Sequence, residues 1–473
     1  MVEISNHSGS FLGCKFNEKV DEFLGIQFAH AERFQTPIDI EKYSEVVKAK
    51  TFGPQSPQVP GFMEEILNTK QLPTSEDCLY LNIWKPSVVK SPLPVLFWIH
   101  GGAYTNGTAA TSWYHGANLV QLGEVIVVSV NYRLGPFGFI GENNLGLLDQ
   151  ISALRWVKRN IESFGGDPDN VTIFGESAGG SSVVALTASP LTKGLITKAW
   201  AMSPSLLQLR SRAEADEAMS TFFEVARVDS LNGLVTLTTQ QVIDATAQMF
   251  QNVENYISTF SPTRGGSGLP EDVYEASANS DIPLIVGTNR DENRLWSVLN
   301  PQPLDEAGAT KYFEKAFAES ASSAWTTYGQ LAHNSSPVQM VSAMQTDQHF
   351  RVPAWQLCDT RSKIGAKTWM YWFTWPTPIF DGVLGCCHAL DLPFMFSNLD
   401  KPNVELFTGT SPVRSKISGH FTGELLQFAK TGRVSWPTYE TSARKTLRID
   451  EDVEVLTDPD PDPVIRKLWN LSS

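Results

Sequence analysis

The chain has 473 residues, with 37 Lys and Arg against 51 Asp and Glu, so its formal net charge is −14. A chain this acidic lacks the positive charge that phosphate binding needs, which excludes nucleic acids and anionic membrane surfaces from the expected partners. With 42% hydrophobic and 11% aromatic residues, it has the composition of a folded globular protein, unlike that of a disordered acidic chain.

The apolar runs of the sequence are short. Residues 94–99 and 125–128 have the length of strands, and no run approaches the roughly 18 residues that cross a membrane, so we expect no membrane span. Residues 1–7 show no basic stretch followed by an apolar one, as an export signal would. The five cysteines include no C-x-x-C pair, which fits free thiols in a reducing compartment. We therefore expect a cytoplasmic location.

No boundary between independent domains is visible in the sequence. It has no internal repeat, low-complexity tract or long Gly/Ser linker, so we expect residues 1–473 to form one unit. The first half alternates strand-like and helix-like segments, with strands over 94–100, 125–131 and 171–174 and a helix over 147–161. Such alternation predicts an α/β fold in which helices flank a large, mostly parallel sheet.

Two later stretches, residues 213–228 and 310–317, have a helical mixture of charged and apolar residues. They lie between or beyond strand-like pieces and could form a cap over the edge of the sheet. We therefore expect cap-like helical insertions around residues 205–262 and 295–345.

Further strands are expected over residues 283–287 and 368–375, each of which follows a polar or Gly-rich segment. Residues 458–463 alternate Asp and Pro. Because each proline lacks a backbone N–H, this segment cannot be a helix or a central strand. It is predicted to be a surface turn before a short last helix.

The most informative segment is the pattern Gly175-x-Ser177-x-Gly179, which follows an apolar strand and opens a helix of small residues. This is the strand–turn–helix context of a nucleophile elbow. A serine hydroxyl is a weak nucleophile at neutral pH, so the fold must project it on a tight turn where a base can reach it. We expect Ser177 to be the nucleophile. The alternative is a Gly-rich strand-to-helix loop without a chemical role.

An acyl-transfer serine also needs hydrogen-bond donors for the developing oxyanion. The sequence His100-Gly101-Gly102-Ala103, at the end of the strand over 94–100, is the expected loop, because backbone N–H groups freed by glycines can point into one small site. We expect the oxyanion hole to be formed by Gly101, Gly102 and Ala178, the residue after the nucleophile. A lone His-Gly-Gly would be an ordinary turn. Here the His-Gly-Gly loop and the Gly-x-Ser-x-Gly elbow follow adjacent parallel strands, so each supports the interpretation of the other.

A resemblance to a known family is carried by five segments: FLGIQFA (23–29), SEDCLYLNIW (75–84), WIHGGAY (98–104), VNYRLGPFGF (130–139) and FGESAGG (174–180). They resemble the type-B carboxylesterase family, which includes cholinesterases and bacterial para-nitrobenzyl esterases. The resemblance runs from about residue 23 to the C-terminal helix. It implies an α/β-hydrolase fold and a catalytic triad of Ser, Glu and His, in that order along the chain.

Chemistry alone leaves the base open. In elbow enzymes the histidine follows the serine and the acid, which leaves His333, His349, His388 and His420 as candidates. His388 ends a loop of small residues before an apolar stretch, where an imidazole could be held against a buried pocket. This segment resembles the family's Gly-x-x-His loop before Leu-Pro-Phe, and the resemblance implies that His388 is the base.

The acid is expected in the polar loop that follows the strand over 283–287, because active-site groups lie at such strand ends in parallel sheets. Spacing does not choose between Asp291 and Glu292. The segment resembles the family's Gly-Thr-x-x-Asp-Glu-Gly, whose second acid belongs to the triad, so the resemblance implies Glu292. The family's following Gly is Asn293 here. Glu176, beside the nucleophile, is expected to be a buried acid that shapes the field of the pocket and does not donate a proton.

Two departures from the family bear on covalent structure and substrate. The usual disulfide partner of Cys78 is replaced by Ser56, so that bridge cannot form. No Trp lies between these two positions, whereas cholinesterases use a Trp there to hold a quaternary ammonium by cation–π contact, so choline esters are poor candidates. Two pairs resemble the structural ion pairs of the family: Arg33 with Glu76, and Arg133 with Asp149.

We therefore predict a serine carboxylesterase that hydrolyses neutral, mainly apolar carboxylic esters through an acyl-enzyme on Ser177, with no cofactor and no metal. Its expected partner is a small-molecule ester, and the chain is expected to be a monomer or a weak homo-oligomer. The alternatives are a non-catalytic, cholinesterase-like adhesion or binding protein, and an amidase or lactonase that uses the same triad.

Overall fold

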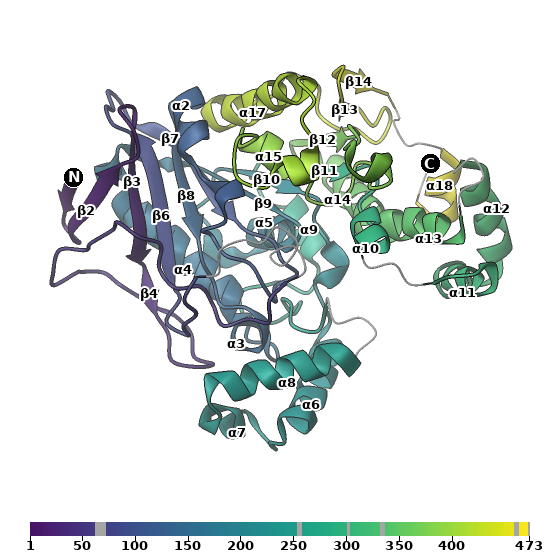
Figure 1. Ribbon diagram of the computed structural model, residues 1–473, viewed down its shortest axis with the longest axis horizontal. Helices are drawn as coiled ribbons and strands as arrows, with labels where there is room; N and C mark the ends of the chain where they lie inside the picture. Colours follow the sequence, from purple (N-terminus) through teal and green to yellow (C-terminus); the bar gives the residue numbers. More distant parts are fainter. Residues whose placement is uncertain (62–71, 253–257, 300–302, 332–335, 458–462, 472–473) are drawn as a thin grey trace.

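The computed structural model describes residues 1–61, 72–252, 258–299, 303–331, 336–457 and 463–471 (Figure 1). In this part of the chain, one sheet has the strand order β1-β2-β3-β6-β8-β7-β9-β10-β11-β12-β13-β14. The strand bounds are β1 Val2–Asn6, β2 Gly9–Lys15, β3 Val20–Gln27, β6 Tyr80–Pro86, β7 Leu93–Ile99, β8 Ile126–Val130, β9 Gly166–Glu176, β10 Lys198–Met202, β11 Leu284–Asn289, β12 Thr368–Phe373, β13 Thr446–Ile449 and β14 Glu454–Leu456. A separate small ladder joins β4 (Ala29–His30) to β5 (Ile38–Asp39).

The centre of the sheet, from β8 to β13, is parallel, and both edges are antiparallel. The register pairs Ile99 with Gly175 and Met202 with both Glu176 and Gly287. The carboxyl ends of β7, β9, β10 and β11 therefore meet at one edge of the sheet, where loops from different strands can form one site.

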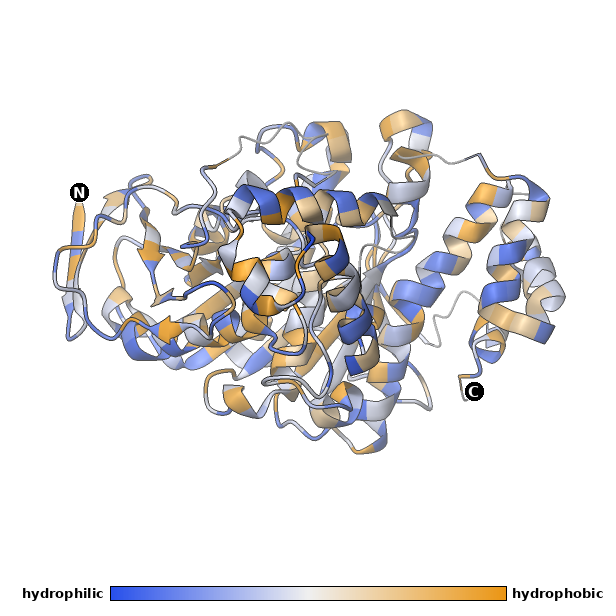
Figure 2. Cartoon of the chain, turned by 90° about the horizontal axis from the view of Figure 1, so that it is seen from below, coloured by the Kyte–Doolittle hydropathy of each residue, from blue (hydrophilic) through white to orange (hydrophobic). Residues whose placement is uncertain are grey.

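Both faces of the sheet are covered by helices, as a parallel sheet requires. Successive residues of β7 alternate between two buried clusters: Val95 and Phe97 join one cluster, while Leu96 and Trp98 join the other. Helices α4 (Leu145–Asn160) and α5 (Ala178–Ala188) contribute to the first cluster, and α2 (Ala117–Gly123) and α17 (Val413–Thr431) contribute to the second. The helices in Figure 2 carry both hydrophobic and hydrophilic residues, as expected for helices that cover a core on one side.

The remaining helices form further layers and the two outer groups of helices in Figure 1. Their bounds are α3 Gly135–Phe139, α6 Arg212–Ala226, α7 Leu231–Thr236, α8 Thr239–Asn252, α9 Val273–Ala278, α10 Arg294–Leu299, α11 Glu306–Phe317, α12 Ala321–Leu331, α13 Pro337–Thr346, α14 Val352–Lys363, α15 Leu392–Met395, α16 Glu405–Thr408 and α18 Pro463–Leu468. Helices α6 to α8 lie within residues 205–262, and α11 and α12 lie within residues 295–345. That these segments act as caps on one chain-long unit stays a prediction.

The expected α/β class with a large, mostly parallel sheet is confirmed. The strand expected over 171–174 is part of the longer β9, and the helix expected over 147–161 is α4 followed by a short 3₁₀ turn. Most of the turn expected over 458–463 lies outside the described residues; α18 follows it.

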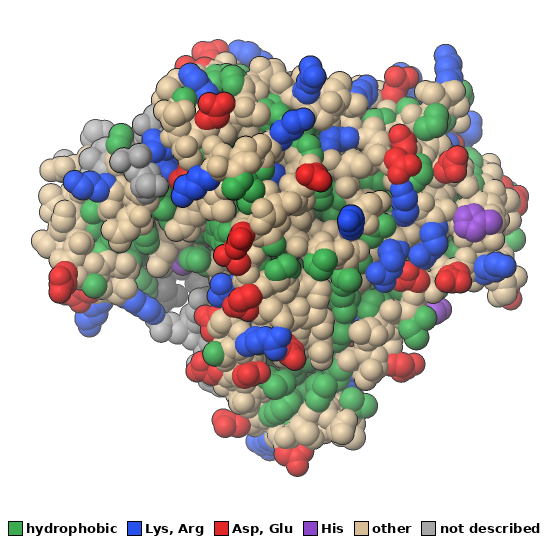
Figure 3. All heavy atoms as spheres, turned by 180° about the vertical axis from the view of Figure 1, so that it is seen from behind, with side chains coloured by type: hydrophobic (Ala, Val, Ile, Leu, Met, Phe, Trp, Pro, Cys, Tyr) green, Lys and Arg blue, Asp and Glu red, His purple; other side chains and the backbone are tan. Residues whose placement is uncertain are grey.

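Charged side chains do not gather by sign on the face shown in Figure 3, where blue and red groups are interspersed. Among the described residues, no helix combines the length and the apolar character that crossing a membrane requires.

Candidate active site

Ser177 stands on a sharp turn between β9 and α5. Its backbone has φ +59° and ψ −121°, a strained conformation for a residue with a side chain, and its N–H donates to Met202 O at 3.0 Å. Gly179 is needed two residues later, because a Cβ there would lie 2.1 Å from Ile99 O. The glycine lets the first turn of α5 pack directly against the end of β7. The serine is thereby held at the carboxyl edge of the sheet, as a nucleophile elbow requires.

The loop after β7 passes directly over the elbow. A Cβ at Gly101 would lie 2.7 Å from Glu176 O and 3.1 Å from the Cβ of Ser177, so only glycine fits. The loop then runs through three consecutive residues with positive φ: Gly102 at +108°, Ala103 at +52° and Tyr104 at +62°. The expected oxyanion residues of this loop thus lie beside the expected nucleophile.

The loop is fixed by hydrogen bonds on both sides of the turn. Tyr132 Oη donates to His100 O at 2.8 Å, and Gly135 N donates to Tyr104 O at 2.7 Å. The rings of His100 and Tyr132 also stack, with centroids 4.5 Å apart. Backbone donors near the serine are therefore held in place before any substrate binds, which is the condition for electrostatic stabilisation of an oxyanion.

One candidate donor was missed by the sequence reasoning. Within the described residues, the backbone N–H groups of Gly102 and Ala103 have no acceptor. The N–H of Ala178 lies in the first turn of α5, where backbone N–H groups have no partner within the helix. Ala103 thus joins Gly101, Gly102 and Ala178 as a candidate. The positive φ of Ala103 is unusual for alanine, so residue type gives no signal for it.

His388 and Glu292 are in direct contact. His388 Nδ1 lies 2.6 Å from Glu292 Oε2, and the other carboxylate oxygen accepts from Asn289 N at 2.7 Å. Both side chains are buried, with exposures of 5% and 0%. A carboxylate whose two oxygens are bound in this way fixes the orientation and the tautomer of the imidazole.

The structure separates the two acids that spacing left open. Asp291 accepts from Cys386 N at 2.9 Å through its side chain, and its own N–H donates to Cys386 O at 2.9 Å. It also pairs with Arg290 and Arg294. Asp291 therefore links the loop after β11 to the loop that carries His388, while Glu292 contacts the imidazole itself.

The other candidate histidines lie elsewhere. His349 is on the turn between α13 and α14, and burial lowers its pKa. His420 is on α17, 3.8 Å from Glu424. His333 lies outside the described residues. His388 is thus the one of these described candidates that contacts an acid of the loop after β11.

Glu176 is closer to the reacting groups than a background charge would be. Its Oε1 lies 3.0 Å from His388 Nε2 in an ion-pair contact, and in the described part of the chain neither atom has a hydrogen-bond partner. His388 Nε2 is therefore not hydrogen-bonded to Ser177 Oγ in this structure. Catalytic hydrogen bonds are often loose without substrate and tighten when it binds.

The charges around the imidazole shift its titration. Burial raises the pKa of the Glu176 carboxyl to about 8, because the charged form loses its hydration. Burial alone would lower the pKa of His388, but the charges of Glu176 and Glu292, with the hydrogen bond to Glu292, raise it to about 9. The charged neighbours thus favour the protonated imidazole by more than burial disfavours it.

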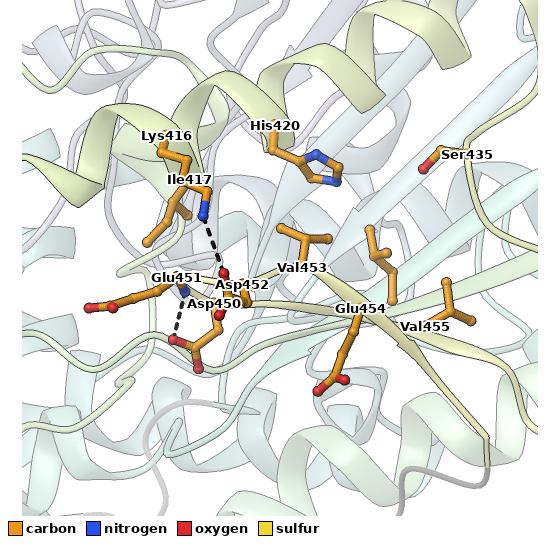
Figure 4. Close-up of a pocket in the computed structure, with 11 residues that line it drawn as sticks. Lys416, Ile417, His420, Ser435, Asp450, Glu451, Asp452, Val453, Glu454 and Val455 are labelled. Carbon is orange, nitrogen blue, oxygen red and sulfur yellow. Dashed lines mark hydrogen bonds and ion pairs between the residues drawn. The ribbon is translucent and has the colours of Figure 1, made fainter.

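A cavity of about 500 Å³ lies apart from these residues, between α17 and the β13–β14 hairpin (Figure 4). Its lining includes Lys416, His420, Asp450 and Glu454, and none of the predicted site residues. Elsewhere too, no group of three or more His, Cys, Asp or Glu side chains within the described residues is arranged to hold a metal ion.

The expected structural ion pairs are present. Arg133 binds Asp149 through two hydrogen bonds of 2.8 and 2.7 Å, and Arg33 Nε lies 2.8 Å from Glu76 Oε2. Cys78 is a buried free thiol.

Comparison with known proteins identifies the family of the chain. The model of the carboxylesterase family matches residues 1–462. The para-nitrobenzyl esterase of Bacillus subtilis (strain 168) is 35% identical over 93% of this chain and 93% of its own, and the phenmedipham hydrolase of Pseudarthrobacter oxydans is 29% identical over 95% and 96%.

Solved structures of esterases are also similar to this chain. A PNB esterase structure superposes with a TM-score of 0.87 at 33% identity, covering 100% of this chain and 99% of its own. The carboxylesterase EST55 of Geobacillus stearothermophilus gives a TM-score of 0.86 at 31% identity, covering 99% and 100%. The expected α/β-hydrolase fold and esterase activity are confirmed, and none of these relatives supports the adhesion-protein alternative. The chain therefore belongs to the carboxylesterase family and is a serine hydrolase that cleaves carboxylic esters.

Proposed function

We propose that Ser177 is the nucleophile of this esterase, that His388 is its general base, and that Glu292 orients the base. The observation that carries the proposal is the position of Ser177 on a strained turn, at the same edge of the sheet as a buried His–Glu pair with a 2.6 Å contact. The oxyanion donors are the N–H groups of Gly101, Gly102 and Ala178, with Ala103 as a further candidate.

The chemistry follows from these positions. Neutral His388 accepts the proton of Ser177 as the serine oxygen attacks the ester carbonyl, and Glu292 stabilises the imidazolium that forms. The backbone N–H groups hold the negative oxygen of the tetrahedral intermediate. His388 then donates its proton to the leaving alcohol, which leaves an acyl-enzyme on Ser177. Water repeats the same steps and releases the acid.

Because only a neutral imidazole can accept the serine proton, an ionised Glu176, which raises the pKa of His388, acts against catalysis. The proton of the serine can be accepted only after the His388 proton has left the Glu176 contact. A bound neutral substrate excludes water from the site without adding charge, so neutral esters fit this arrangement better than charged ones. Trp296 and Phe350 pack beside His388, so the imidazole lies in apolar surroundings.

We also propose a cytoplasmic location and a monomeric or weakly oligomeric state. Support for the location comes from the cysteines: all five are free thiols, and four of them are buried. Free thiols persist in a reducing compartment.

The first test of the proposal compares Ser177→Ala with the wild type in the hydrolysis of p-nitrophenyl butyrate. We expect kcat to fall by about ten-thousandfold or more, because only binding and the oxyanion donors remain. Ser129→Ala is the matched control, since Ser129 is a buried serine on β8 with hydrogen bonds to Asn82 and Ala109. It is expected to keep its activity within a few fold.

A fluorophosphonate probe identifies the nucleophile directly. It should add one label per chain to the wild type and to the Ser129 variant, on the peptide that contains residue 177, and none to Ser177→Ala. Comparable turnover by Ser177→Ala, or a label on another serine, would overturn the assignment.

A further inference from the structure

The imidazole of His388 is held by two aromatic rings that come from outside its own loop. Trp296 of α10 packs on it with ring centroids 5.0 Å apart, and Phe350 packs on it at 4.8 Å. The two aromatic rings also stack on each other, with an interplanar angle of 12°. With Glu292 on Nδ1, these rings restrict the rotation of the imidazole.

Phe350 reaches the imidazole because the chain forms a π-helical turn at η7 (Asp347–Arg351) between α13 and α14. Such turns insert an extra residue into a helix and often occur at functional sites. Here Arg351 pairs with Asp347 at 2.6 Å, and Tyr328 Oη donates to Asp347 Oδ2 at 2.6 Å. All three side chains are buried, so the ion pair holds the wide turn in a fixed form.

The same turn is also bonded to the loop that carries the acid. Arg351 Nη2 donates to Arg290 O at 2.7 Å, and Asn293 N donates to Thr346 Oγ1 at 3.0 Å. The side chain of Asn293 adds a bond from its Nδ2 to Gln345 Oε1 at 2.9 Å. Asn293 directly follows Glu292, at the position where the family resemblance predicts glycine. A glycine there would keep the backbone bond and lose the side-chain bond.

We propose that residues 345–351, here called the brace, together with Trp296 and Asn293, position the base and the acid relative to each other. The brace contacts the base through Phe350 and the acid loop through Arg351, Thr346 and Gln345. Trp296, Phe350 and Asn293 are then positioning residues: they act through His388 and Glu292 and make no bond to substrate. This inference rests on the proposed roles of His388 and Glu292.

A simpler role for the rings is to line the pocket that holds the acyl chain. The two roles predict different kinetics. A pocket wall affects KM and acyl preference, so its loss changes with the length of the acyl chain. A misplaced base slows the chemical step for every ester by the same factor, because a displacement of about 1 Å can cost on the order of a hundredfold in rate.

The test uses Trp296→Leu and Phe350→Leu, with Trp296→Phe as the matched variant that keeps a ring over His388. Trp296 is partly exposed, so its replacement removes little core packing. The substrates are p-nitrophenyl acetate and p-nitrophenyl octanoate. We expect both Leu variants to lose about tenfold in kcat on both esters, with KM within about twofold, and Trp296→Phe to stay within about threefold of the wild type. Unfolding midpoints verify that the variants are folded at the assay temperature.

Several results would overturn the proposal. The first is a change in the KM of the Leu variants in place of a fall in kcat, and the second is a fall in their activity that grows with the length of the acyl chain. The others are an equal fall in the kcat of Trp296→Phe and Trp296→Leu, and Leu variants with the kcat of the wild type. Ser177→Ala, assayed alongside, separates the two levels. If Ser177→Ala is inactive while the Leu variants are fully active, the role of Ser177 is supported and the positioning role of the brace is wrong. If it keeps its turnover, the triad assignment itself fails.

The link between the acid loop and the brace is tested by a double-mutant cycle. Asn293→Ala and Gln345→Ala should each lower kcat by about threefold, and the double variant should lose no more than either single variant, because both remove the same bond. Additive losses would show that this bond does not connect the two segments.

Discussion

At the scale of single residues, the contact between Glu176 and His388 predicts an unusual pH dependence. The Glu176 carboxylate helps to raise the pKa of His388 to about 9, and only the neutral imidazole can accept the serine proton. Glu176→Gln removes the charge and keeps the shape. The pKa of His388 should then fall, so the acidic limb of the kcat/KM profile should move to lower pH by about one unit or more.

The measurement is the pH profile of kcat/KM for p-nitrophenyl butyrate between about pH 5 and pH 10 in buffers of constant ionic strength. Glu424→Gln is the control, because Glu424 is a buried acid on α17 away from the triad. The acidic limb of the Glu424→Gln profile should coincide with that of the wild type. An unmoved limb in Glu176→Gln, or one moved to higher pH, would contradict the role given to this carboxylate.

At the scale of elements, the β9–α5 junction depends on how closely α5 approaches β7. Gly179→Ala would place a Cβ 2.1 Å from Ile99 O and 2.9 Å from His100 O, so the helix or the strand must move. Overpacking of this kind costs about 1–3 kcal/mol, and here the displacement falls on the nucleophile and on the oxyanion loop together. We expect activity to fall by about a hundredfold, because both groups lose their positions.

Gly423→Ala gives the comparison for this junction. Gly423 lies in α17 with no heavy atom within 4 Å of its Cβ position, so alanine should be tolerated and should favour the helix. Activity and the unfolding midpoint are measured for both variants. Equal activity in the two would contradict the close-packing argument for the elbow.

Most of the elements near the site could be predicted because their signals are local. The strand, the spaced glycines and the small residues around Ser177 specify the elbow within a few residues of sequence, and β11 ends directly before the polar loop of Glu292. Other features depend on contacts between distant segments. The left-handed Ala103 follows from the packing of its loop, and the π-helical turn before α14 has no residue pattern of its own.

The contact between Glu176 and His388 could not be predicted for the same reason. Sequence showed that a carboxylate follows Gly175, but whether it faces solvent, the core or the imidazole depends on where the loop after β12 places His388. The choice between Asp291 and Glu292 likewise needed the fold, since their spacing is equivalent and only the loop geometry directs one of them to His388 and the other to Cys386.

At the scale of the whole molecule, the buried Arg133–Asp149 pair joins three distant parts of the chain. Arg133, after β8, binds both oxygens of Asp149 on α4 and donates to Gln35 O at 2.7 Å in the N-terminal part. The two side chains are only 3% and 0% exposed. Arg133→Met would leave the Asp149 carboxylate buried without a counter-charge, which costs about 3–5 kcal/mol.

We therefore expect Arg133→Met to unfold at a clearly lower urea concentration than the wild type, followed by tryptophan fluorescence. Arg212→Met is the matched control, because it breaks an ion pair with Glu142 whose side chains are 55% and 52% exposed. Exposed pairs contribute about 0–1 kcal/mol, since water already solvates both charges, so this variant should unfold close to the wild type. Equal shifts in the two variants would mean that burial of the Arg133–Asp149 pair does not determine its contribution, and that the link between the N-terminal part, β8 and α4 is not a main source of stability.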